Sequence, residues 1–204
     1  MLKKNIAVII LLLLLLGSFL ANICFPSNGF ARERESSEFF KDGKEIERKW
    51  LINAEDIPYD LSKADIFEIE QSYICFDPEI RIRKITCLGT ETFYVLTIKS
   101  DMSGDGLVRS EVEYYITEES YYQLLAKKEG DTIYKTRYQI QIDNMVRVID
   151  IFKGDLSGLA YLEIEYESEE QAVTDEAPNW VIKDVTSDRR YRNQSLAKYG
   201  IPKD

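Results

Sequence analysis

The sequence predicts an α+β protein, mainly antiparallel β, in which eight strands close into a barrel and helices pack outside it. Eight strand-like runs follow one another with turn residues such as Asp77-Pro78 between them, which favours antiparallel hairpins. Charged residues recur at every other position of these runs, and alternate residues of a barrel strand face its interior. We therefore expect a polar interior, with apolar residues such as Ile46, Ile82 and Ile164 facing outward.

The individual elements follow from periodicity and from turn residues at their ends. Strands are expected at residues 44–52, 67–76, 79–87, 91–100, 107–116, 132–141, 144–152 and 159–167. Thr117 is a good N-cap for a helix through about Lys128, which would place Tyr121 and Leu124 on its inner side. Two shorter helices are expected at residues 167–173 and 193–199.

The N-terminal residues 1–31 have the features of a signal peptide or an N-terminal membrane anchor. Lys3 and Lys4 precede an apolar run, and Gly29-Phe30-Ala31 offers small residues before a possible cleavage point. Without cleavage, residues 6–25 are nearly long enough to attach the protein to a membrane by spanning it. In either case we expect the domain to be exported, whether secreted, periplasmic or anchored outside the cytoplasm. Residues 32–43 are expected to form a polar linker, and residues 44–204 a single domain.

Composition excludes several kinds of chemistry. The 204 residues include no histidine, which excludes histidine zinc sites, Ser/His triads and histidine acid–base catalysis. After residue 31 the chain carries 24 basic and 36 acidic residues, so no nucleic-acid partner is expected. Cys75 and Cys87 could pair in an oxidising compartment. Hairpin pairing would set Cys75 nearer Arg81 than Cys87, so free thiols are expected. Nothing in the sequence indicates an oligomeric state.

The alternating charges suggest a site for a metal and an anion. Glu45, Glu47 and Lys49 share one face of a strand, where two carboxylates can hold Mg²⁺ or Mn²⁺ and a lysine can hold a phosphate. A solvated strand face also alternates, but it needs no concentration of acids and arginines. The same spacing recurs in Arg81/Arg83, Thr97/Lys99, Arg109/Glu111/Glu113, Lys135/Arg137 and Glu163/Glu165.

These elements, in this order, resemble the CYTH domain, whose members are also called triphosphate tunnel metalloenzymes. Asp150-X-Phe152-X-Gly154 and the tail from Asp184 to Tyr191 continue the resemblance, which runs from about Lys44 to about Ala197. It implies an antiparallel eight-stranded tunnel with helices outside and a C-terminal helix near one mouth. Residues 44–204 would then form a CYTH-like triphosphate tunnel domain.

The resemblance and the charge pattern together assign roles to individual residues. A multiply charged ligand with metal ions would neutralise both sets of buried charges, which are costly when unpaired. The expected catalytic residues are Glu45, Glu47, Lys49, Glu111 and Glu113. Those expected to bind substrate are Lys49, Arg81, Arg83, Lys99, Arg109, Lys135, Arg137, Lys183 and Arg190. The expected ligands of Mg²⁺ or Mn²⁺ are Glu45, Glu47, Glu113, Asp150, Glu163 and Glu165.

The function that follows is metal-dependent hydrolysis of a small triphosphate-containing molecule. The start of the domain looks most like that of the small bacterial inorganic triphosphatases, so inorganic tripolyphosphate is favoured, with nucleoside and thiamine triphosphates left open. Adenylyl cyclase activity, which the same family includes, is one alternative. Another is an exported module that binds polyphosphate or organic phosphates without cleaving them. That module would keep the cations but would not need every acid.

Overall fold

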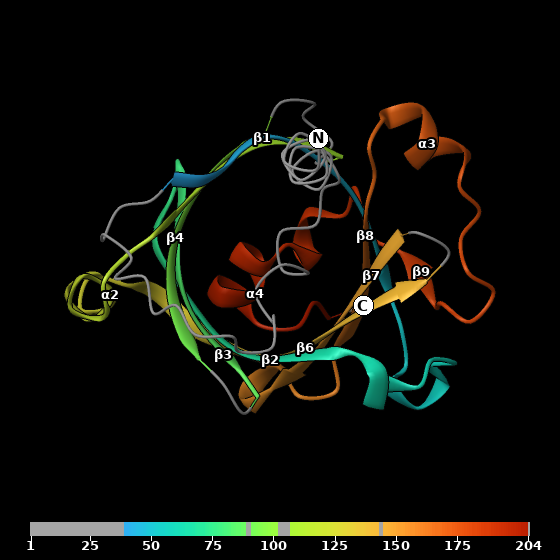
Figure 1. Cartoon of the computed structure of the whole chain (residues 1–204), viewed down its shortest axis with the longest axis horizontal. Coiled ribbons are helices and arrows are strands. Elements are labelled where there is room, and N and C mark those ends of the chain that lie inside the picture. The colour runs from blue at the N-terminus through green and yellow to red at the C-terminus, as the bar shows by residue number, and fades with distance from the viewer. Residues whose placement is uncertain (1–38, 89–90, 102–106, 143–144, 204) are drawn as a thin grey trace, which may run out of the picture.

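The strands form one closed antiparallel barrel in the computed structural model, which describes residues 39–88, 91–101, 107–142 and 145–203. Along the barrel the order is β5-β4-β3-β2-β6-β7-β8-β1, and β1 pairs with β5 to close the ring (Figure 1). The predicted eight-stranded closed barrel is confirmed. Its strands are β1 (Phe39–Leu51), β2 (Asp65–Phe76), β3 (Glu79–Cys87), β4 (Thr92–Asp101), β5 (Val108–Tyr115), β6 (Glu129–Ile142), β7 (Met145–Lys153) and β8 (Ala160–Glu165).

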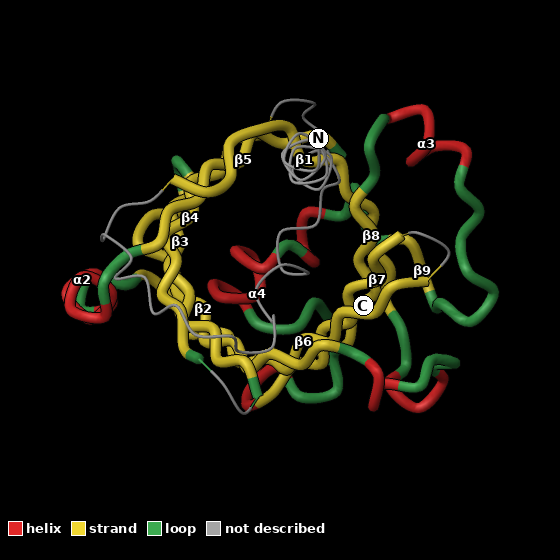
Figure 2. The backbone as a smooth tube through the Cα atoms, viewed as in Figure 1, coloured by secondary structure: helices red, strands yellow, loops and turns green. Residues whose placement is uncertain are grey.

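Short helices surround the barrel or cross one end of it (Figure 2). The helices α2 (Glu118–Leu125) and α3 (Glu169–Thr174) lie outside the ring, while α4 (Asn193–Tyr199) packs against β6 and β2. The two-residue strand β9 (Lys183–Asp184) pairs with the end of β1. Four 3₁₀ turns complete the described chain: η2 (Ala54–Asp56), η3 (Leu61–Lys63), η4 (Gly154–Leu156) and η5 (Arg189–Tyr191).

Several element ends differ from the expected ones, among them the start of β1 and the end of α2. β1 begins at Phe39, opposite Tyr114 of β5, so residues 39–43 belong to the barrel and not to a linker. The helix α2 has the expected cap, since the Thr117 side chain accepts a hydrogen bond from the Ser120 N–H, but it ends at Leu125. The N–H groups of Lys127 and Lys128 bond only three residues back, which tightens and ends the helix.

The expectations for residues 1–31 lie outside the described residues. In the described ranges, no helix is long and apolar enough to cross a membrane. Neither Cys75 nor Cys87 forms a disulfide within the described chain, as expected from the hairpin register.

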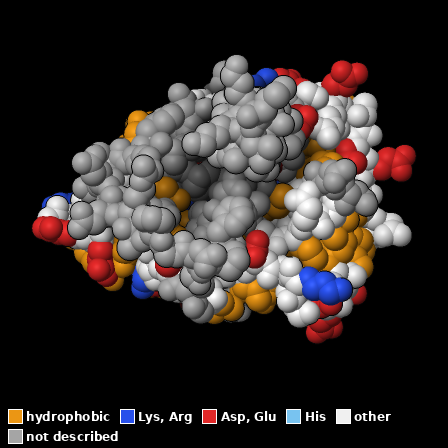
Figure 3. Space-filling model, in the orientation of Figure 1, with side chains coloured by type: hydrophobic (Ala, Val, Ile, Leu, Met, Phe, Trp, Pro, Cys, Tyr) orange, Lys and Arg blue, Asp and Glu red, His pale blue; other side chains and the backbone are white. Residues whose placement is uncertain are grey.

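Outward-facing apolar residues are covered on one side of the barrel. Ile46, Trp50 and Ile164 pack with Ala172 of α3, and their side chains are at most 5% exposed. The outer face of β4 is less well covered, and its Ile98 is 37% exposed. On the face shown in Figure 3, the acidic and basic side chains of the described residues are scattered and form no continuous patch.

The barrel interior is polar only in its middle, which departs from the expected polar lumen. Towards one end, Phe67, Ile69, Ile85, Cys87 and Val95 form a buried apolar cluster. They occupy the same alternating face as the charged residues, since Ile85 and Cys87 follow Arg81 and Arg83 at two-residue spacing on β3. An apolar layer therefore fills this end.

The helix α4 provides a second apolar layer. Its residues Leu196 and Ala197 pack with Tyr73 and Ile133, which come from β2 and β6. Close approach is possible because Gly130 has no side chain: a Cβ there would lie 2.6 Å from the Ala197 carbonyl oxygen, and its φ of +69° suits glycine. The charged part of the interior is thus held between two apolar layers.

Candidate active site

A single cavity of about 110 Å³ gathers most of the predicted site residues from different strands. Their side chains point inward because they lie at every second position on strands that all face the same interior. The predicted residues that line the cavity are Glu45, Glu47, Lys49, Arg81, Arg83, Lys99, Arg109, Glu111, Glu113, Arg137, Glu163 and Glu165.

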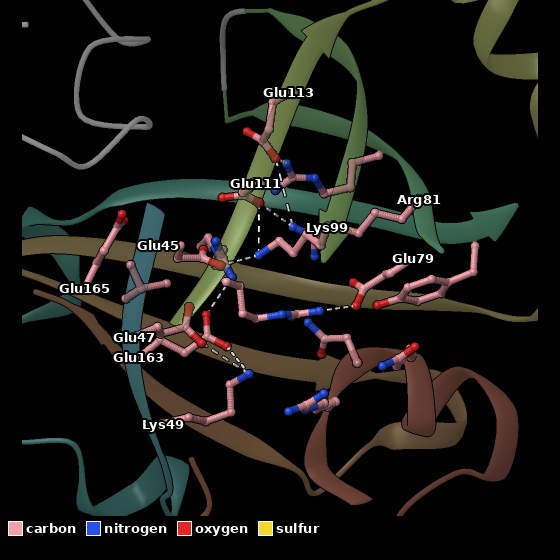
Figure 4. Close-up of a pocket in the computed structure, with 18 of the residues that line it drawn as sticks. Glu45, Glu47, Lys49, Glu79, Arg81, Lys99, Glu111, Glu113, Glu163 and Glu165 are labelled. Carbon is pink, nitrogen blue, oxygen red and sulfur yellow. Dashed lines mark hydrogen bonds and ion pairs between the residues drawn. The ribbon is translucent and has the colours of Figure 1, made fainter. Parts of the chain in front are cut away.

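One wall is a cluster of acids on β1 and β8. Glu47 lies opposite Glu165 and Lys49 lies opposite Glu163 in the antiparallel register, so carboxylates from both strands converge (Figure 4). The Lys49 Nζ is 2.9 Å from Glu163 and 3.4 Å from Glu47. The cluster therefore comes from one strand pairing that brings together segments more than a hundred residues apart.

This crowding changes proton affinities in the cluster. Burial, followed by the nearby charge of Glu163, raises the pKa of Glu47 to about 7. Burial alone would lower the pKa of Lys49, but the Glu163 and Glu47 carboxylates together hold it above its ordinary value. At neutral pH the cluster therefore contains a charged lysine beside a carboxyl group that still holds a proton part of the time.

The facing wall carries cations on β3 and β4, each held by an acid of β5. Arg81 is 3.2 Å from Glu111, and Arg83 pairs with Glu113. The Thr97 hydroxyl donates to Glu113 at 2.7 Å and accepts from Arg83 at 3.0 Å. These contacts fix the direction of both guanidinium groups.

Lys99 connects the two walls. Its Nζ lies 2.6 Å from Glu45 on β1 and 2.9 Å from Glu111 on β5, and its side chain is 7% exposed. A phosphate or a metal ion entering here would compete for groups that already satisfy one another.

The arginines retain unused donors. The Nε atoms of Arg81, Arg83 and Arg109 are buried and have no hydrogen-bond partner among the described residues. A buried N–H without an acceptor is costly, and each of these belongs to a side chain that lines the cavity. The site therefore offers several converging donors to an anion that enters it.

Lys135 and Asp150 lie behind the wall instead of lining the cavity, which differs from their expected roles as substrate and metal ligands. Asp150 is fully buried, 2.5 Å from Lys135 and 2.6 Å from Arg137, and Arg137 is also 3.0 Å from Glu163. Although burial opposes ionisation, Arg137 and then Lys135 hold the pKa of Asp150 well below its usual range. Burial lowers the pKa of Lys135 to about 8. This geometry makes the pair a support for Arg137.

Lys183 and Arg190 also lie away from the cavity, unlike the expectation that they bind substrate. Both side chains are exposed. Lys183 lies 5.9 Å from the Tyr191 ring, and Arg190 is 2.8 Å from Asp188. The tail instead contributes Arg192, which lines the cavity beside Glu45, Glu47 and Lys49.

Most acids of the cavity are paired with cations. Within the described ranges, no group of three or more acids lies close enough to hold a metal ion. The donor set nevertheless fits a hard divalent ion, because Glu45, Glu47, Glu163 and Glu165 all present carboxylate oxygens to one side of the cavity.

Two curated relatives match the chain over most of its length. No family model matches it. An inorganic triphosphatase from Nitrosomonas europaea is 34% identical over 157 residues, which are 75% of this chain and 96% of that protein. An inorganic triphosphatase from Acetivibrio thermocellus is also 34% identical, over 159 residues, which are 76% of this chain and 94% of that protein. The chain belongs to the CYTH family of triphosphate tunnel enzymes.

A solved CYTH structure supports the same assignment at the level of the fold. The crystal structure of the inorganic triphosphatase NE1496 superposes with a TM-score of 0.53 at 31% identity, covering 75% of this chain and 93% of that one. The charged barrel interior described above is therefore set in the fold of this CYTH relative.

One acid of this CYTH cavity was not predicted from the sequence. Glu79 opens β3, is 7% exposed and pairs with Arg109. The signal was present, since Glu79, Arg81 and Arg83 continue the two-residue spacing. It was missed because Glu79 follows directly on the Asp77-Pro78 turn, where a charge suggests a hairpin end.

Proposed function

We propose that this protein hydrolyses inorganic tripolyphosphate in its barrel, with Mg²⁺ or Mn²⁺ as the cofactor. The protein is a triphosphate hydrolase of the CYTH family. The observation that carries the proposal is that cations able to bind phosphates and carboxylates able to hold a metal line one and the same cavity. The names of the two inorganic triphosphatases favour the inorganic substrate.

The cations of the chain would hold the phosphates. Guanidinium groups bind phosphate oxygens with two parallel hydrogen bonds, and Arg81, Arg83 and Arg109 each retain a buried Nε donor for this purpose. Lys49 and Lys99 add compact positive charges. Their ammonium groups pair with carboxylates and would pair with phosphate oxygens instead when the ligand enters. Glu111 and Glu113 keep the arginines aimed into the cavity.

The acids of β1 and β8 would hold the metal. Glu45, Glu47 and Glu165 supply the hard oxygen donors that Mg²⁺ and Mn²⁺ prefer. A bound ion supplies neutralisation of the charge that develops on the transferred phosphoryl group. Such transfers need little covalent chemistry from the protein, so positioning by Lys49, Arg81 and Arg137 is the main contribution of the remaining residues.

The test is phosphate release from tripolyphosphate, ATP and pyrophosphate with Mg²⁺, with Mn²⁺ and with chelator. Glu45→Gln removes one proposed metal ligand while keeping shape, and we expect turnover to fall about 100-fold. Glu68→Gln is the matched control, since Glu68 lies on the outer face of β2 and pairs with Lys153. Binding of tripolyphosphate without metal-dependent release would contradict hydrolysis and favour a module that captures phosphates.

We also propose that the protein acts outside the cytoplasm. Lys3-Lys4 and the apolar run after them favour export, with residues 6–25 as a possible membrane attachment. A reporter enzyme that is active only outside the cytoplasm, fused after residue 204, tests this directly. We expect the reporter to be active, and an inactive reporter would show that the protein is not exported.

A further inference from the structure

Like Glu111 and Glu113, Glu79 is an acid that pairs with an arginine of the cavity, but it lies on β3, whereas Glu111 and Glu113 lie on β5. It shares the inner face of β3 with Arg81 and Arg83, and it accepts a hydrogen bond from Arg109. Figure 4 shows Glu79 on the opposite side of the cavity from Glu47, Glu163 and Glu165, near α4. Glu79 therefore stands apart from the proposed metal ligands, and the metal does not explain it.

The carboxylate of Glu79 is charged at neutral pH. Burial alone would raise its pKa, but Arg109 and then Arg81 hold the pKa of Glu79 below its ordinary value. Its side chain is 7% exposed, so water screens the charge poorly.

Two further polar side chains, Tyr73 and Asn193, line the cavity with Glu79. Tyr73, fully buried beside it, accepts a hydrogen bond from the Gln71 amide and packs with residues of α4. The buried Oδ1 of Asn193 at the start of α4 lines the cavity and has no hydrogen-bond partner among the described residues. Because the Tyr73 hydroxyl and the Asn193 amide can each donate as well as accept, the charge of the Glu79 carboxylate is what repels phosphate oxygens here.

We propose that Glu79 limits the length of the phosphate chain, so that the site accepts tripolyphosphate and rejects longer linear polyphosphates. A chain whose end lies at the acids of β1 and β8 would cross the cavity, which Lys99, Arg81 and Arg109 also line, and would meet Glu79 on the opposite side. A further phosphate would place a negative charge against a buried carboxylate, and such juxtaposition is how sites reject wrong ligands. The inference rests on the proposed triphosphatase activity.

Glu79 also holds Arg109 in place, and the loss of that role would have a different effect on the kinetics from the loss of a length limit. If anchoring were its whole contribution, its loss would weaken binding of every phosphate chain by the same factor. A limit on chain length instead changes the ratio between substrates. The ratio of kcat/KM for tripolyphosphate to kcat/KM for tetrapolyphosphate therefore separates the two.

The experiment measures this ratio and ATP hydrolysis for the wild type, Glu79→Gln, Glu79→Asp and the outer-face control Glu68→Gln. The wild type is expected to prefer tripolyphosphate by about tenfold or more, and Glu79→Gln to lose most of that preference. Glutamine keeps an acceptor for Arg109 but removes the charge. Glu79→Asp keeps the charge and should keep the preference, and Glu68→Gln should match the wild type.

An unchanged ratio in a folded Glu79→Gln variant that still hydrolyses tripolyphosphate would overturn the inference. A selective loss of ATP hydrolysis, with an unchanged ratio between the two polyphosphates, would also overturn the inference. Glu79 and the acceptor atoms beside it would then bind the organic part of ATP. If Glu79→Gln does not fold, the wild type still decides, since equal use of both chains contradicts a limit. Failure of the wild type to hydrolyse tripolyphosphate at all would refute the proposed function instead.

Discussion

Two buried lysine–carboxylate pairs in this barrel have similar geometry and opposite surroundings. Lys99 lies 2.6 Å from Glu45 and lines the cavity, while Lys135 lies 2.5 Å from Asp150 behind the wall. Lys99 has a second acid within 2.9 Å, whereas the oxygens of Asp150 are already shared between Lys135 and Arg137. The first pair can exchange partners with a ligand, and the second pair is a fixed support.

The largest expected effect comes from breaking the support. Asp150→Asn would leave Lys135 buried without a counter-charge and Arg137 with Glu163 alone, and we expect the free energy of unfolding to fall by about 3–5 kcal/mol. Glu45→Gln should cost less than about 1 kcal/mol, because Lys99 keeps Glu111. Denaturant unfolding of both variants measures this difference. Equal losses would show that the two pairs serve the same role.

The two regions should also respond to pH with opposite signs. Asp150 has a lowered pKa in the folded state, so its contribution to stability is present at neutral pH and is lost as pH falls below the unfolded pKa near 4. Glu47 has a raised pKa, so between its ordinary value of 4.5 and about 7 the folded state binds the extra proton. Stability of the metal-free protein should therefore fall as pH rises through that range.

The variant Glu47→Gln isolates the contribution of Glu47 to the pH dependence of stability. We expect it to remove a loss of about 1–2 kcal/mol between pH 5 and pH 8, a value reduced from the full shift because Glu47 is 28% exposed. Thermal or denaturant unfolding with chelator across this range measures the slope. A slope identical to that of the wild type would mean that Glu47 ionises normally.

Arg137 joins the two regions, since it contacts both Asp150 and Glu163. Arg137→Lys keeps the positive charge but loses the paired hydrogen bonds of the guanidinium group. We therefore expect KM for tripolyphosphate to rise about tenfold with a smaller change in kcat. Steady-state kinetics at saturating Mg²⁺ provide the measurement. An unchanged KM would limit Arg137 to a structural role.

The smallest expected effect concerns the tail. Lys183→Ala and Arg190→Ala remove exposed cations that lie outside the cavity, and we expect KM to change less than about twofold. Arg192→Ala is the contrasting variant, because Arg192 lines the cavity, and it should raise KM several-fold. A large effect at Lys183 would mean that the tail moves onto the substrate.

Sequence pattern alone was sufficient for the faces of the strands. The alternation in Glu45-X-Glu47-X-Lys49 and in Arg109-X-Glu111-X-Glu113 placed each of these residues on the inner side, because strand periodicity is local. The caps and turns at Thr117 and Asp77-Pro78 were equally readable, since they depend on a few neighbouring residues. The family resemblance then implied the closed, antiparallel eight-stranded barrel.

Depth along the barrel was decided only by the tertiary structure. A two-residue spacing gives the side of the strand and not the level in the barrel, so Lys135 and Asp150 looked the same as Lys99 and Glu45. Their levels depend on the register between strands and on α4, which closes against Gly130. Sequence periodicity therefore determined which charges point inward, whereas strand register and helix packing decided which of those charges can meet a ligand.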